Sequence, residues 1–136
     1  MIKKIDHIAI AVQNLEGALE TFRNVLGCAP EAITVEEVPS EKVRVAFIPV
    51  GETKIELLQP LGDDSPISRF LEKNGDGMHH IALETDNIQE ETLRLADLDL
   101  KTLAPPKDGA GGKSIVFLHP KQTSRVLLEI AQKKHR

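Results

Sequence analysis

The chain has 136 residues, a length that suits one domain or two small modules sharing a core. Hydrophobic residues make up 40% and charged residues 28% of it, which is typical of a globular protein and excludes a disordered one. A formal net charge of −4, no Trp and no Tyr argue against a basic, base-stacking surface for nucleic acid.

Cysteine usage and hydropathy predict where the protein works. The single cysteine, Cys28, cannot form an intrachain disulfide, which indicates a reducing compartment. The first residues lack the apolar run of a signal peptide, and no apolar window is long enough to cross a bilayer. We therefore expect a cytoplasmic protein with no nucleic-acid partner and no membrane partner.

The first half of the chain predicts a β-α-β-β-β module. In its first strand, His7 lies among small alanines on one face, while Asp6 and bulky β-branched residues lie on the other. Small residues beside a His leave space for another group. Asn14 is a suitable N-cap, and Gly27 a suitable C-terminal residue, for the helix between them. The predicted elements are a strand at 5–12, a helix at 15–26, a mixed stretch at 30–42, and strands at 43–50 and 54–59.

The second half repeats this plan after a connector. The connector predicts a short helix that Ser65 caps. In the strand that follows, His80 shares a face with Ala82, while His79 points the other way. Asn87 predicts the start of the next helix. The remaining predicted elements are that helix to about 98, loops at 105–106 and 109–112, strands at 114–118 and 125–131, and a frayed tail at 133–136.

An internal repeat with an offset of 73 positions relates the two halves. It pairs His7 with His80, and Glu56 with Glu129, inside otherwise apolar strands. Two copies are too few for a solenoid, so the repeat predicts one domain built from paired modules. The predicted domain is residues 1–136, with module one at about 1–61, a connector at about 62–77 and module two at about 78–132.

Polar residues that persist at matched positions need a physical reason, and we interpret them as metal ligands. If approximate two-fold symmetry relates the copies, equivalent strands line a shared trough and their inward side chains converge. Two imidazoles and two carboxylates suit a divalent first-row metal in octahedral coordination, with two open positions for a substrate. The tight Cys and His spacings of a closed zinc site are missing. The alternative is that each His is packed and each Glu is paired with a Lys. The predicted ligands are His7, Glu56, His80 and Glu129.

Six segments spread over essentially the whole chain carry a family resemblance. They are IDHIA at 5–9, KIELLQPL at 54–61, DSPI at 64–67, GMHHI at 77–81, FLHPK at 117–121 and VLLE at 126–129. Together they resemble the methylmalonyl-CoA epimerase family of the vicinal oxygen chelate (glyoxalase/bleomycin resistance/dioxygenase) superfamily. The resemblance implies an α+β fold, in which two paired βαβββ modules form a cupped mixed sheet around a metal, and a homodimer.

The resemblance also implies site residues and a cofactor. His7, His80 and Glu129 fall on the family's ligand positions, and Glu56 falls on a fourth position where some members have Gln. The implied cofactor is a divalent ion, Co²⁺ first, with Mn²⁺, Zn²⁺ and Ni²⁺ as alternatives. Some members carry a catalytic carboxylate where this chain has Val45.

The implied activity is inversion of C2 in the CoA thioester methylmalonyl-CoA. A metal would spread the charge of the enolate while two bases exchange protons on opposite faces. Glu129 is the best candidate for one base and Glu56 for the other, with Glu41 and Glu37 as fallbacks. The loop residues that could contact the CoA phosphates are Gly111, Gly112, Lys113, Lys121 and Arg125.

Several roles stay open at this level. His79 is expected to support a ligand or to pack on a helix, and His119 to orient a loop or to touch substrate. Glyoxalase I chemistry is the nearest alternative function, since it also uses two His and two Glu. An extradiol dioxygenase would need iron, held by two His and one Glu, and would leave Glu56 without a role. A metal-free drug-binding protein of the bleomycin-resistance kind would need no metal ligands.

Overall fold

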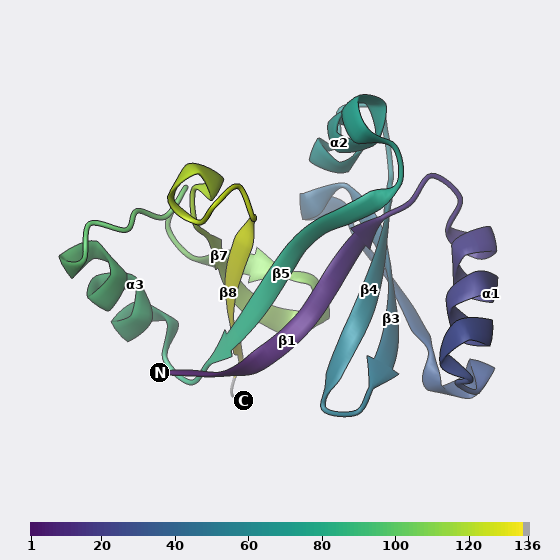
Figure 1. Cartoon of the computed structure of the whole chain (residues 1–136), viewed down its shortest axis with the longest axis horizontal. Coiled ribbons are helices and arrows are strands. Elements are labelled where there is room, and N and C mark those ends of the chain that lie inside the picture. The colour runs from purple at the N-terminus through teal and green to yellow at the C-terminus, as the bar shows by residue number, and fades with distance from the viewer. Residues whose placement is uncertain (135–136) are drawn as a thin grey trace. The chain divides into compact units, whose positions relative to one another are not determined.

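The computed structural model describes residues 1–134; His135 and Arg136, part of the predicted tail, lie outside the described residues. The chain forms two compact units, one of Met1–His7 with the chain from His80 onward, the other of Ile8–His79. The elements (Figure 1) are β1 (Ile2–Ala11), α1 (Leu15–Leu26), β2 (Thr34–Val38), β3 (Val43–Val50), β4 (Thr53–Pro60), α2 (Pro66–Asn74), β5 (Gly77–Thr85), α3 (Ile88–Asp97), β6 (Lys107–Gly109), β7 (Lys113–Phe117) and β8 (Leu128–Lys133).

In the unit Ile8–His79 the strands follow the order β2–β3–β4–β1. β1 runs parallel to β4, while β2, β3 and β4 pair antiparallel. α1 covers one face of β3 and β4 (Figure 1), because its apolar stripe needs a partner surface. The buried core of this unit consists of Val12, Leu15, Ala46, Ile48 and Leu57.

The other unit repeats the same topology. Its strands follow the order β5–β8–β7–β6, with β5 parallel to β8 and the other neighbours antiparallel. α3 supplies part of the core, which consists of Ile88, Leu95, Val116, Leu118 and Ile130. A strand, a helix and three more strands, with the first strand parallel to the last, therefore occur twice. This confirms the predicted α+β fold class with two βαβββ modules.

The predicted helix ends are confirmed. The side chain of Asn14 accepts a hydrogen bond from the amide of Gly17, and that of Asn87 accepts one from the amide of Glu90. Ser65 caps α2 in the same way. α1 ends at Gly27, whose φ of 67° is the left-handed conformation that favours glycine. Among residues 1–134, no helix is long and apolar enough to span a bilayer.

Several strand boundaries differ from the sequence prediction. β1 begins at Ile2 instead of residue 5, and the predicted loop at 109 is the end of the short strand β6. The last strand begins at Leu128 instead of 125, and Ser124 and Arg125 before it have φ values of 57° and 67°, outside the extended region. Lys133, which was predicted to lie in the tail, is the last residue of β8.

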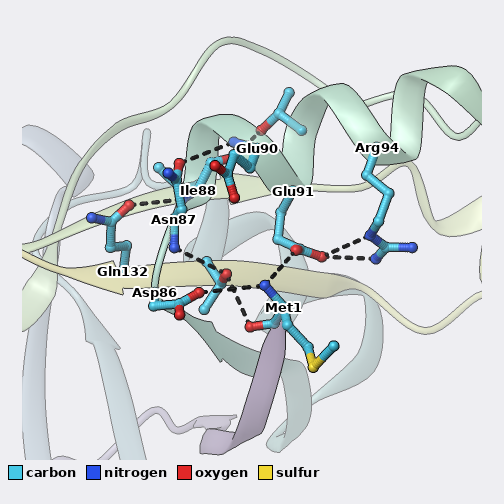
Figure 2. A network of polar contacts seen from close by, with 10 residues as sticks. Met1, Asp86, Asn87, Ile88, Glu90, Glu91, Arg94 and Gln132 are labelled. Carbon is cyan, nitrogen blue, oxygen red and sulfur yellow. Dashed lines mark hydrogen bonds and ion pairs between the residues drawn. The ribbon is translucent and has the colours of Figure 1, made fainter.

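A polar network holds the start of β1 against α3 (Figure 2). The ammonium group of Met1 lies 2.9 Å from Oε2 of Glu91 and 3.3 Å from Oδ1 of Asp86. Nη2 of Arg94 donates to Oε1 of Glu91 at 2.7 Å. The Glu91 carboxylate is buried, and the Met1 ammonium and the Arg94 guanidinium hold its pKa below the usual range.

This network predicts a specific pH dependence for the variant Glu91→Gln. A carboxyl group whose pKa is lowered by folding stabilises the native state at pH values above its ordinary value of 4.5. That contribution is lost as the pH falls through the lower folded-state pKa. The difference in unfolding free energy between wild type and Glu91→Gln should therefore be largest above pH 4.5 and shrink in acid. Urea unfolding from pH 3 to pH 8, for chains that begin at Met1, measures it.

The matched control is Glu90→Gln, at the exposed neighbouring position of the same helix. It should leave the unfolding free energy close to that of wild type at every pH. Parallel stability curves for wild type and Glu91→Gln across the whole range would contradict the assigned role of Glu91.

Candidate metal centre

Three of the four predicted ligands meet inside one unit. Nε2 of His7 lies 3.1 Å from Nε2 of His80, and Nε2 of His80 lies 3.3 Å from Oε1 of Glu129. The other carboxylate oxygen of Glu129 lies 3.7 Å from Nε2 of His7. All three side chains are buried. We call His7, His80 and Glu129 the three-ligand cluster.

The strand register explains why His80 and Glu129 meet. Glu129 of β8 lies opposite Ala82 of the parallel strand β5, and His80 lies two residues earlier on the same face of β5. Because Ala82 is small, the carboxylate can reach past it to the imidazole. On its other side, Glu129 faces Phe117 of β7, whose ring packs edge-on against His80 with centroids 5.4 Å apart.

The cluster fits a metal ion by donor type and by spacing. Two atoms that each lie about 2.1 Å from one cation are separated by roughly 3–4 Å, depending on the angle between them. The three separations in the cluster, 3.1, 3.3 and 3.7 Å, fall in that range. Imidazole nitrogens with a carboxylate oxygen suit a divalent first-row metal. The structure therefore contains a ligand cluster that could hold such an ion.

A buried carboxylate and a buried ammonium group support His7 from behind. Oδ2 of Asp6 lies 2.7 Å from Nδ1 of His7, and the ammonium of Lys113 donates to the same Oδ2. Burial lowers the pKa of His7, although the hydrogen bond to Asp6 opposes this effect. The imidazole is therefore neutral near neutral pH, which is the form that ligates metals.

Sequence reasoning missed both supporting residues. Strict alternation predicted Asp6 on the face of β1 away from His7, yet its carboxylate reaches the imidazole. For Lys113 and the glycines before it, sequence reasoning favoured an ordinary turn, with contacts to the CoA phosphates as the alternative. The Lys113 side chain is instead buried, and its ammonium is bound to Asp6. The signal that could have found Lys113 is a lysine at the start of the apolar strand β7.

The fourth predicted ligand, Glu56, lies in the unit Ile8–His79. It is buried in β4 and faces Ala9 of the parallel strand β1. This register matches that of Glu129 with Ala82.

The fallback bases differ from Glu56 in exposure. Glu37 is exposed on β2, and Glu41 is half-buried in the turn that follows. Val45, where the family resemblance predicts a carboxylate in some members, is fully buried in β3.

His79 and His119 lie outside the three-ligand cluster. The ring of His79 packs edge-on against Phe70 of α2, with centroids 5.1 Å apart, which is the helix-packed alternative predicted for it. Nδ1 of His119 accepts a hydrogen bond from the amide of Lys121, so His119 orients its loop.

Comparison with known proteins gives three kinds of match. The Glyoxalase/Bleomycin resistance protein/Dioxygenase superfamily model matches residues 6–117. Mitochondrial methylmalonyl-CoA epimerase of Homo sapiens is 45% identical over 95% of this chain and 73% of its own length. Ethylmalonyl-CoA/methylmalonyl-CoA epimerase of Cereibacter sphaeroides is 44% identical over 97% of this chain and 99% of its own. A Streptomyces coelicolor methylmalonyl-CoA epimerase variant in complex with 2-nitronate-propionyl-CoA has a TM-score of 0.90 at 30% identity, covering 99% of this chain and 100% of its own.

The three-ligand cluster predicts a metal-dependent gain in thermal stability. A ligand that binds only the native state stabilises it by about 2.7 kcal/mol at a free concentration of 100 times its Kd. Adding Co²⁺ to chelator-treated protein should therefore raise the melting temperature. His80→Gln should lose most of this shift, whereas its sequence neighbour His79→Gln should keep it. Equal shifts in the two variants, measured by differential scanning fluorimetry, would rule out His80 as a ligand.

Proposed function

Since the chain belongs to the glyoxalase/bleomycin resistance protein/dioxygenase superfamily, we propose that it is a metal-dependent methylmalonyl-CoA epimerase. The likeness to the human and C. sphaeroides epimerases, 44–45% identity over at least 95% of this chain, carries the proposal. The reaction is the interconversion of the (2R) and (2S) forms by removal and return of the proton at C2. The substrate is a small-molecule CoA thioester.

The buried cluster supplies the chemistry that this reaction needs. A divalent cation held by His7, His80 and Glu129 would act as a Lewis acid toward the negative charge that develops on the substrate. The neutral imidazole of His7, whose pKa burial lowers, adds no charge to the site. Glu129 presents both carboxylate oxygens to the cluster, so one oxygen can serve as a ligand while the other takes the C2 proton. All three side chains are buried, which would limit the access of water to that charge.

We assign Glu56 as the fourth ligand and the second base. Two observations support this assignment: Glu56 is buried, and it faces Ala9 as Glu129 faces Ala82. A His two residues before each of these alanines completes the same pattern in both modules. Epimerisation needs a proton donor on the face opposite the acceptor, which a second carboxylate provides.

Metal identity, assembly and location are part of the same proposal. Co²⁺ is the expected native ion, with Mn²⁺, Zn²⁺ and Ni²⁺ as alternatives that the same nitrogen and oxygen donors accept. A homodimer in the cytoplasm, acting in propionate metabolism, is expected, and the single Cys28 supports a reducing compartment. We further propose that residues 1–136 act as one domain, because His7 from module one lies in the cluster with residues from module two.

The direct test is deuterium exchange at C2 of methylmalonyl-CoA in D₂O, on chelator-treated protein with and without added Co²⁺. We expect metal-dependent exchange, and a loss of at least about 100-fold in Glu129→Gln, since a positioned general base contributes roughly 10²–10⁴-fold. The hemithioacetal of methylglyoxal and glutathione should not react under the same conditions. Turnover of that compound without C2 exchange would replace this proposal with glyoxalase I chemistry.

A carboxylate series tests the second base. Glu56→Gln should retain exchange of the C2 proton from one epimer while losing interconversion of the two, because only one face keeps its base. Glu37→Gln and Glu41→Gln, at less buried positions, should keep both activities. If either control loses interconversion while Glu56→Gln retains it, the second base is that residue and not Glu56.

A further inference from the structure

We propose that Asp6 and Lys113 are positioning residues, which hold His7 in its Nδ1-protonated form with the Nε2 lone pair directed into the three-ligand cluster. The proposal rests on the proposed function in one respect only, namely that the lone pair serves to bind the catalytic metal ion. The arrangement itself can be tested without metal or substrate.

One oxygen atom links the two supporting groups to the ligand. Oδ2 of Asp6 accepts from the Lys113 ammonium and lies 2.7 Å from Nδ1 of His7. A carboxylate oxygen only accepts hydrogen bonds, so the proton between Asp6 and His7 belongs to Nδ1. A neutral imidazole with a proton on Nδ1 has none on Nε2. The free lone pair is then at Nε2, the atom that faces His80 and Glu129.

The Lys113 ammonium holds the Asp6 carboxylate in position, and this carboxylate in turn orients the His7 imidazole. The side chains of Asp6 and Lys113 are 2% and 6% exposed, and they are 107 residues apart in the sequence. A carboxylate buried without a counter-charge would be strongly disfavoured, and an isolated ammonium equally so. Each group therefore requires the other in place. Turning Asp6 away from His7 would break the contact with Lys113.

The approach of Lys113 is set by the turn before β7. Gly111 and Gly112 have φ values of 73° and 68°, and Lys113 is the first residue of the strand. Lys113 also lies opposite Gly109 in the antiparallel pair with β6. A Cβ atom at Gly109 would clash with Ile115, so the β6–β7 pair requires glycine at this position. The same unit contains an exposed lysine–carboxylate pair, Lys134 with Asp108, which has no imidazole attached in the described contacts.

The decisive measurement is the imidazole ¹⁵N spectrum of chelator-treated protein labelled at histidine, with the His7 signals assigned by their loss in His7→Gln. In wild type, His7 should show a protonated Nδ1 and an unprotonated Nε2. Asp6→Ala should shift this ring toward a mixture of the two tautomers. Asp6→Asn retains an oxygen acceptor for Nδ1–H and should keep the wild-type tautomer. Asp108→Ala, in the exposed pair, should change nothing.

Metal binding gives a second readout, by calorimetric titration with Co²⁺. Loss of a partner of a metal-ligating His typically weakens metal binding about 10–100-fold. Asp6→Ala should fall in that range, Lys113→Met should weaken binding by a smaller factor, and Lys134→Met should match wild type.

An unchanged His7 tautomer in a folded Asp6→Ala protein overturns the proposal, whatever the enzyme activity. If Asp6→Ala does not fold, Lys113→Met decides: wild-type Co²⁺ affinity and an unchanged His7 spectrum overturn the role of Lys113. If Asp6→Ala shows the expected tautomer change but the wild-type protein has no epimerase activity, this proposal stands and only the proposed function is overturned.

Discussion

The parallel pairing of the first and last strands of each module is the constraint on which the site depends. It sets Ala82 opposite Glu129, and the same register sets Ala9 opposite Glu56. Registered residues of neighbouring strands point to the same face, so each glutamate joins the face that carries a His two positions before the alanine. A shift of one residue would turn Glu129 toward the apolar core beneath α3 and would place Leu128 or Ile130 at the cluster.

The second constraint is that each buried charged group needs a partner. The contacts that link Lys113 and Asp6 to the three-ligand cluster provide these partners. The ammonium of Lys113 is bound to Asp6, Asp6 to Nδ1 of His7, and Nε2 of His7 to Nε2 of His80, which lies 3.3 Å from Glu129. An unpaired charge in this interior would cost several kcal/mol. Removing one member therefore disturbs its neighbours, and substitutions within the network should not have additive effects on stability. The positions of the metal ligands and the stability of this unit are thus coupled.

Sequence patterns predicted the fold and the cluster where the physical signal is local or repeated. Alternation in β1 and β5, the caps at Asn14 and Asn87, and the offset between His7 and His80 are all of this kind. The position of Lys113 was not predictable in this way, because its partner is 107 residues away and a lysine after two glycines is typical of an exposed turn. The start of β8 was missed because the left-handed residues before it are Ser and Arg, which carry no strong local signal for that conformation.

The internal repeat accounts for the matched positions of His7 and His80, but not for the neighbouring side chains that support them. At the offset of 73 that relates His7 to His80, Asp6 corresponds to His79. Asp6 binds the imidazole beside it, whereas His79 packs against Phe70, and the ring of Phe117 packs edge-on against His80. The two halves of the repeat therefore keep the same donor atoms but surround them with different neighbours.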